Sequence, residues 1–145
     1  MHELILQNIG KYISLSDQET ELFISMLKIR KLRKRQFLVQ AGEVCNYESF
    51  VNKGCVRQFY VDESGQEHTV MFAIEDWWTS DMYSIVTGKP ALTNVDAIED
   101  SEISSIHKDD LENLFIKVPK FERLFRILLQ RAFVAHQQRL YENMS

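Results

Sequence analysis

Cysteine and histidine are scarce in this sequence, and their placement excludes several metal-dependent proteins. The two cysteines, Cys45 and Cys55, are spaced like neither a zinc knuckle nor an iron–sulfur cluster. We interpret both as small buried hydrophobic residues. The four histidines form no His-x-His or His-x3-His pair, which disfavours a metalloenzyme of the cupin type. The sequence therefore predicts no metal and no cofactor.

Long apolar runs and an excess of positive charge are also missing. No uncharged apolar stretch approaches the roughly 18 residues of a membrane span, and the N-terminus lacks the basic and apolar regions of a signal peptide. We therefore expect a cytoplasmic protein. A net charge of −4 is unfavourable for neutralising phosphates, so we do not expect nucleic acid to bind this segment directly. No nucleophile motif is present, and we predict that the chain is not an enzyme.

The 145 residues suffice for one domain with a substantial core, and 45% of them are hydrophobic. Gly42 and Gly54 flank a short apolar strand, as glycines do at tight corners of a small barrel. Residues 55–61 and 67–74 read as two strands joined by the hairpin turn of residues 62–65. Strands are expected from about residue 29 to 107, and the order of helices, strands and helices predicts a mainly β barrel with helices at its ends.

Helices are expected on both sides of the strands. Residues 3–13 have apolar residues at helical spacing, and Ser16 with Glu19 forms a capping box for a second helix. A third helix spans residues 108–118 and ends before Pro119, which can open a long fourth helix from about 119 to 143. The basic run of residues 28–35 is interpreted as the solvated side of an entering strand, with Ile29, Leu32 and Phe37 as inward anchors.

The spacing of residues 38–54 resembles the first signature of cyclic-nucleotide-binding domains, although Glu48 and Ser49 depart from that pattern. The order of elements resembles the N-terminal effector domain of Crp/Fnr family transcription regulators across essentially the whole chain. The resemblance implies a double-stranded β-helix, or jelly-roll, over residues 1–118 and a dimerisation helix over 119–145. A DNA-binding helix-turn-helix module is expected downstream, where this chain stops, so the chain is either a fragment or acts through its partner surface alone.

In the resembled family, a phosphate-binding cassette holds the nucleotide, and its counterpart here is residues 78–97, a segment that we call the cassette. The family's glycine falls on Ser80, its ribose-binding Glu on Asp81, its small residue on Tyr83 and its phosphate-binding Arg on Ala91. Without the arginine, a buried phosphodiester has no bidentate cation, so we do not expect cyclic AMP to bind.

The cassette nevertheless supplies candidates for a pocket that takes another small-molecule effector. Trp77, Trp78 and Tyr83 are expected either to fill the old nucleotide cavity or to shape it for a different ligand. The candidate pocket residues are Trp78, Thr79, Ser80, Asp81, Met82, Tyr83, Ala91, Leu92, Thr93 and Asn94, with Gln137 and Gln138 from the long helix.

The long helix has two apolar flanks, and we expect one flank to face the barrel and the other to face a partner helix in a homodimer. The predicted interface consists of Phe121, Phe125, Leu128, Ala132 and Ala135. The second flank consists of Leu124, Leu129, Phe133 and Leu140. The leading hypothesis is a ligand-sensing and dimerisation domain of a Crp/Fnr-like regulator. The alternative is a ligand-free dimerisation adaptor with a filled pocket.

Overall fold

The computed structural model describes residues 1–144, so Ser145, the end of the predicted dimerisation segment, lies outside the described residues. The helices are α1 (Glu3–Gly10), α2 (Asp17–Met26), α3 (Met82–Thr87), α4 (Lys108–Lys117) and α5 (Lys120–Met144). The strands are β1 (Leu27–Leu32), β2 (Phe37–Val39), β3 (Tyr47–Lys53), β4 (Cys55–Val61), β5 (Glu67–Ile74), β6 (Trp78–Thr79), β7 (Asn94–Ala97) and β8 (Ser101–His107).

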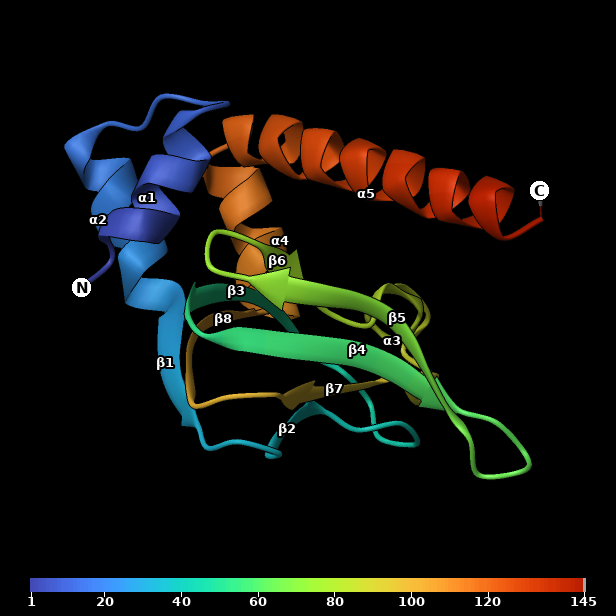
Figure 1. Ribbon diagram of the computed structural model, residues 1–145. Helices are drawn as coiled ribbons and strands as arrows, with labels where there is room; N and C mark the ends of the chain where they lie inside the picture. The colour runs from blue at the N-terminus through green and yellow to red at the C-terminus, as the bar shows by residue number, and fades with distance from the viewer. Residues whose placement is uncertain (145) are drawn as a thin grey trace.

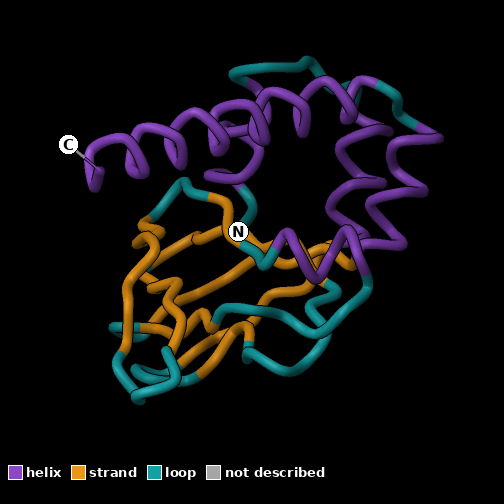
Figure 2. The backbone as a smooth tube through the Cα atoms, turned by 90° about the vertical axis from the view of Figure 1, so that its right-hand side faces the viewer, coloured by secondary structure: helices purple, strands orange, loops and turns teal. Residues whose placement is uncertain are grey.

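The strands form two antiparallel sheets that face each other as a barrel. One sheet has the order β1-β8-β3-β6 and the other has the order β2-β7-β4-β5. The views of Figures 1 and 2 show α1, α2, α4 and α5 gathered on one side of the strands, while α3 lies beside the barrel. This arrangement confirms the predicted fold class, a mainly β jelly-roll with flanking helices and a long C-terminal helix.

The hairpin of β4 and β5 has the bounds that the sequence predicts. At its start, Gly54 has a φ of +97°, and a Cβ atom there would lie 2.8 Å from the carbonyl oxygen of Asp100. Both the backbone conformation and the close approach exclude other residues at this corner. In the turn, the Oδ1 of Asp62 accepts hydrogen bonds from the backbone N–H groups of Ser64 (2.9 Å) and Gln66 (3.0 Å), as expected for an Asp that initiates a turn.

The hydrophobic core between the helices and the β1-β8-β3-β6 sheet is built from large side chains. Phe23 of α2 stacks on Phe121 of α5 with ring centroids 5.2 Å apart, and both are fully buried with Phe50 of β3. The predicted capping box begins α2, where the Ser16 Oγ accepts from the Glu19 N–H (3.2 Å) and Glu19 Oε1 accepts from the Ser16 N–H (2.8 Å). This core attaches the helices firmly to one sheet.

The interior of the barrel forms a second core, which is built from smaller side chains. Val51, Val56, Val95 and Ile103 are fully buried there. Alanines and the thiol of Cys45 complete the lining. Small side chains leave the two sheets close together, so little of the barrel interior is free for a ligand.

Strand β1 exposes its cations to solvent, as the sequence predicts, but they do not all lie on one face of the strand. Its register pairs Arg30 with Ile103, a residue of the barrel interior, and side chains alternate along a strand. Arg30 and the buried Leu32 therefore share the barrel face, whereas Ile29 lies on the helix face. Phe37 is 43% exposed, so it is not the inward anchor that the sequence suggested.

Helix α5 is buried only over its first turns, where Phe121, Leu124 and Phe125 pack into the helix-covered core. The remainder extends past the barrel, as Figures 1 and 2 show. Among residues 1–144, no helix combines the length and apolar character needed to cross a membrane.

Candidate functional site

The cassette consists of a strand, a short helix and a second strand. β6 ends at Thr79, α3 spans Met82–Thr87, and β7 begins at Asn94. Asp81 is the N-cap of α3, and Gly88 ends the helix in the left-handed conformation with a φ of 73°. These two residues fix where the helix begins and ends, and they bring the start of α3 next to the turn that contains Ala91.

Asp81 is the centre of the cassette, and the chain itself satisfies its carboxylate. The side chain is 2% exposed. Its Oδ1 accepts from the Ser84 N–H (2.9 Å), and its Oδ2 accepts from the N–H groups of Leu92 (3.2 Å) and Thr93 (3.0 Å) and from the Thr93 hydroxyl (2.7 Å). The backbone donors that could bind an anionic ligand are therefore already bound to a carboxylate of the protein.

Ala91, the position at which the sequence analysis expects the arginine of the resembled family, is held by backbone pairing. Its N–H donates to the Glu43 carbonyl (2.8 Å), and its carbonyl accepts from the Gly42 N–H (2.9 Å). Nearby, the Ser84 Oγ donates to the Lys89 carbonyl (2.6 Å) and accepts from the Cys45 N–H (2.8 Å). The cassette is thus attached to the loop between β2 and β3 on one side.

Most of the other polar candidates also make hydrogen bonds within the chain. Gln58 of β4 donates its Nε2 hydrogens to the Thr93 hydroxyl (3.0 Å) and the Ser80 carbonyl (3.4 Å), and the Asn94 Oδ1 accepts from the Ala41 N–H (2.8 Å). Thr79 is different, because its Oγ1 is one of two buried side-chain atoms in residues 1–144 that have no hydrogen-bond partner.

Glu48 is a residue of this region that the sequence reasoning did not assign to the site. It lies on β3, is 6% exposed and hydrogen-bonds with the Ser80 side chain. Burial raises the pKa of its carboxyl from 4.5 to about 7, because the ionised form loses its hydration. A signal was present in the sequence, since Glu48 breaks the apolar pattern of the signature strand.

The three aromatic residues do not share one cavity. Trp78 packs in the helix-covered core, with its ring centroid 5.2 Å from Phe50 and 5.3 Å from Phe125, and its Nε1 donates to the Asn8 Oδ1 (2.9 Å). Trp77 and Tyr83 are 48% and 41% exposed. No ring contact within the described part of the chain joins two of the three. The structure therefore shows neither an aromatic plug nor an aromatic pocket at the cassette.

The remaining candidates lie at the surface. Met82 is half-buried at the start of α3, and Leu92 is largely exposed. Gln137 and Gln138 are exposed on the projecting part of α5, and no hydrogen bond among residues 1–144 connects them to the cassette. A ligand that bridges the cassette and this helix therefore stays a prediction.

Comparison with known proteins identifies the family. The chain matches the cyclic nucleotide-binding domain over residues 29–117, which is more than half of its length. The protein belongs to this family. A comparison with curated proteins gives no match. The comparisons indicate no catalytic family.

Solved structures with the same fold include regulators and their isolated domains. The catabolite activator protein of Thermus thermophilus is 20% identical with a TM-score of 0.77, over 94% of this chain and 63% of that protein. A cyclic nucleotide-binding domain from Methylobacillus flagellatus is 18% identical with a TM-score of 0.84, over 97% and 83% of the two chains. The sensor domain of the transcriptional regulator DNR from Pseudomonas aeruginosa is 14% identical with a TM-score of 0.75, over 94% and 89%.

These identities show the shared fold and no more. This chain spans less than two thirds of the length of the catabolite activator protein that it resembles.

Proposed function

We propose that this chain is the ligand-sensing and dimerisation domain of a cytoplasmic Crp/Fnr-like transcription regulator, and that it does not bind cyclic AMP or cyclic GMP. Membership of the cyclic nucleotide-binding family and the likeness to the DNR sensor domain support the regulatory role. DNA is contacted through a downstream helix-turn-helix domain. The exclusion of cyclic nucleotides rests on one observation, the four hydrogen bonds that the Asp81 carboxylate accepts within the cassette.

A cyclic phosphate bound in the cassette lies next to the Asp81 carboxylate, and the cassette has no arginine to compensate the two negative charges. Two negative charges about 4 Å apart repel each other by about 4 kcal/mol at an effective dielectric constant of about 20. The ligand also has to displace Asp81 from the N–H groups of Leu92 and Thr93, and each lost hydrogen bond costs about 1 kcal/mol. Lys89 is exposed and offers only a point charge in place of a bidentate guanidinium.

Calorimetric titration tests this exclusion. We expect no heat of binding from cyclic AMP or cyclic GMP at concentrations up to about 1 mM. The Ala91→Arg variant adds the cation but leaves Asp81 in place, so we expect it to stay silent as well. A micromolar dissociation constant for the unmodified chain contradicts the proposal.

Dimerisation is proposed through the exposed flank of α5. In the single chain, Phe121 and Phe125 are already covered by their own domain, and Leu128 packs partly against the same core. Ala132 is exposed and Ala135 is half-buried. We therefore place the interface on the second flank, where Leu129, Phe133 and Leu140 are 46%, 65% and 50% exposed.

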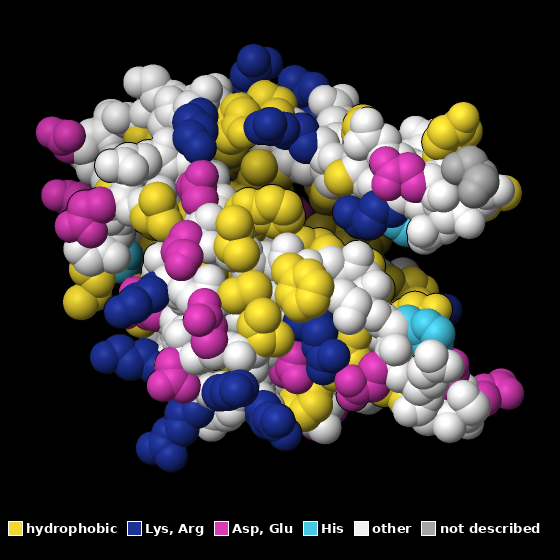
Figure 3. All heavy atoms as spheres, viewed as in Figure 1, with side chains coloured by type: hydrophobic (Ala, Val, Ile, Leu, Met, Phe, Trp, Pro, Cys, Tyr) yellow, Lys and Arg dark blue, Asp and Glu magenta, His cyan; other side chains and the backbone are white. Residues whose placement is uncertain are grey.

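The apolar surface extends beyond this helix. Figure 3 shows hydrophobic side chains gathered over the β4–β5 face below α5. Phe72 and Ile74 of β5 are each about half exposed. Exposed apolar surface of this kind is typical of an interaction site.

Introducing a charge on the exposed flank tests the dimer. We expect the Phe133→Glu variant to be monomeric in light scattering, because a carboxylate cannot be buried unpaired between two helices. The control is Gln138→Glu, which adds the same charge elsewhere on α5 and is expected to keep the dimeric mass. A wild-type chain with the mass of a monomer, or a Phe133→Glu variant with the mass of a dimer, refutes this interface.

A ligand-free adaptor is the second candidate, because Asp81, Thr93 and Gln58 satisfy one another and leave no polar group of this network free. Thermal shifts with a library of metabolites distinguish the two functions. Reproducible stabilisation by a metabolite supports sensing, and silence across the library supports the adaptor.

A further inference from the structure

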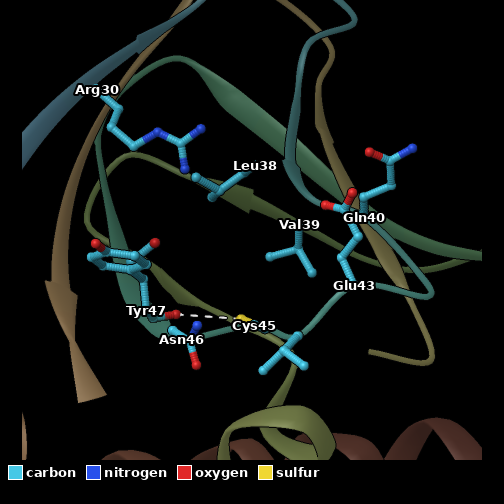
Figure 4. A pocket seen from close by; sticks show the side chains of 10 residues that line it. Arg30, Leu38, Val39, Gln40, Glu43, Cys45, Asn46 and Tyr47 are labelled. Carbon is cyan, nitrogen blue, oxygen red and sulfur yellow. Dashed lines mark hydrogen bonds between the residues drawn. The ribbon is translucent and has the colours of Figure 1, made fainter. Parts of the chain in front are cut away.

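A small cavity of about 90 Å³ lies beside the β2–β3 loop, and none of its lining residues belongs to the cassette. Figure 4 shows its lining, which comes from β1, β2, this loop and the start of β3. The inner part is formed by buried side chains that include Cys45 and Ser49, and the rim carries Arg30, Glu43, Asn46 and Tyr47. The cavity is far smaller than the roughly 300 Å³ needed for a drug-sized ligand, which excludes a nucleotide.

The register of β1 places two cations on the barrel face, Arg30 in the lining of this cavity and Lys28 beside it. Lys28 pairs with Ser105 and Arg30 pairs with Ile103, and both positions alternate with the helix-facing residues of β1. Lys28 donates a hydrogen bond from its Nζ to the Tyr47 hydroxyl (3.1 Å). Tyr47 can therefore still donate its own hydroxyl hydrogen to another group.

The donors at the rim are unused. Within residues 1–144, neither the guanidinium of Arg30 nor the side-chain amide of Asn46 makes a hydrogen bond or an ion pair. The Ser49 hydroxyl, which is 2% exposed, shares a hydrogen bond of 2.9 Å with Ser105 and keeps further capacity. The Glu43 carboxylate is the one acidic group among the lining residues.

We propose that this cavity binds a small monocarboxylate of about four to six heavy atoms, with its carboxylate on Arg30. The planar guanidinium matches a carboxylate in two parallel hydrogen bonds, and the Asn46 amide and Tyr47 hydroxyl are additional donors at the rim. A volume of about 90 Å³ leaves room for only a few non-hydrogen atoms, which limits the ligand to this size.

The charges select for a single negative charge. Arg30 contributes one positive charge and Glu43 one negative charge to the lining. The Lys28 ammonium, which is bound to the Tyr47 hydroxyl beside the cavity, adds a second positive charge, so a monoanion neutralises these three groups. A dianion such as phosphate leaves an excess negative charge next to Glu43 and is expected to bind more weakly.

The cavity is connected to the cassette through the backbone of one loop. The loop pairs with Ala91 through the backbone of Gly42 and Glu43 (2.9 and 2.8 Å), and the Cys45 N–H donates to Ser84 (2.8 Å). Occupancy of the cavity is therefore expected to shift the amide signals of Ser84 and Ala91. Binding itself does not rest on the proposed function of the cassette, since its contacts lie on β1, β3 and the loop.

Titration of the whole chain with sodium acetate, followed by ¹H–¹⁵N correlation spectra at constant ionic strength, tests the proposal. We expect saturable shifts at Cys45, Asn46, Tyr47 and Ser49 with a dissociation constant on the order of 1 mM. Arg30→Gln is expected to weaken binding at least about tenfold. The matched control is Lys31→Gln, which removes the same charge from the neighbouring position on the other face of β1 and is expected to leave the affinity unchanged.

Three results overturn the proposal. They are shifts that sodium chloride reproduces, an unchanged affinity in Arg30→Gln, and equal weakening in Lys31→Gln. Inorganic phosphate, used as a competitor, is expected to displace acetate less effectively than formate does, and the reverse order contradicts the assignment of a monoanion. Cyclic AMP binding by the cassette, which disproves the proposed function, is read at different residues and leaves the acetate result intact.

Discussion

The cassette and the cavity beside β1 both adjoin the β2–β3 loop, but their polar groups differ in whether they have partners within the chain. In the cassette, Asp81 accepts four hydrogen bonds, and Thr93 is further bound by Gln58. In the cavity, the side chains of Arg30 and Asn46 have no hydrogen-bond or ion-pair partner among the described residues. The first arrangement stabilises the fold at the expense of ligand binding, and the second keeps donors available for a ligand.

Under the proposed function, this difference explains how a domain of the cyclic nucleotide-binding family keeps its fold without a bound cyclic nucleotide. An arginine in the cassette requires an anion from solution, whereas Asp81 supplies the anion from within the chain. The start of α3 and the turn at Leu92 and Thr93 stay joined in either case, because a negative group lies between them. The fold therefore does not require a bound nucleotide at this place.

Removal of the Asp81 carboxylate is the strongest test of this difference between the cassette and the cavity. We expect the Asp81→Ala variant to lower the free energy of unfolding by about 3–5 kcal/mol, because it removes the N-cap of α3 and leaves the donors of Thr93 unsatisfied. Urea denaturation measures the change. Asp81→Asn keeps one carbonyl oxygen as an acceptor and is expected to lose about half as much.

The matched control is a substitution at the cavity, Arg30→Ala. Arg30→Ala removes an exposed side chain without partners, so we expect its stability to stay within about 0.5 kcal/mol of wild type. If Asp81→Ala costs as little as Arg30→Ala, the hydrogen bonds of the cassette do not stabilise the domain, and the contrast between the two regions is wrong.

Much of the fold could be predicted from the sequence because its signals are local. The capping box at Ser16, the hairpin at residues 62–65 and the helix boundary at Pro119 each depend on neighbours within a few positions. The orientation of β1 was less predictable, because a run of six cations among residues 28–35 has no clear alternation. Only the pairing with β8 shows which cations face the barrel.

The candidate site was predictable in position but not in its contacts. The alignment located Asp81 as the remaining carboxylate, but its partners Leu92 and Thr93 lie 11 and 12 residues away and meet it only in the folded chain. Trp78 was assigned to the pocket, yet a strand of two residues does not indicate which way its side chain points. Packing against Phe50 and Phe125 decides this orientation.

Glu48 provides a further test of whether the cassette side is closed to solvent. In the folded protein, burial raises the pKa of its carboxyl to about 7, whereas exposure in the unfolded chain returns the pKa to about 4.5. Between these values the folded state holds a proton that the unfolded state has lost. The free energy of unfolding therefore falls as the pH rises from about 4.5 through 7.

We expect this decline to amount to about 2–3 kcal/mol, which is smaller than the effect of Asp81→Ala. The measurement is urea denaturation of wild type and Glu48→Gln at several pH values between 5 and 8.5, because the difference between the two proteins removes the contributions of all other groups. The amide keeps a hydrogen-bonding group for Ser80 but does not ionise, so the variant gains stability relative to wild type as the pH rises. Parallel pH profiles for the two proteins mean that water reaches Glu48, and in that case the cassette side is open rather than closed.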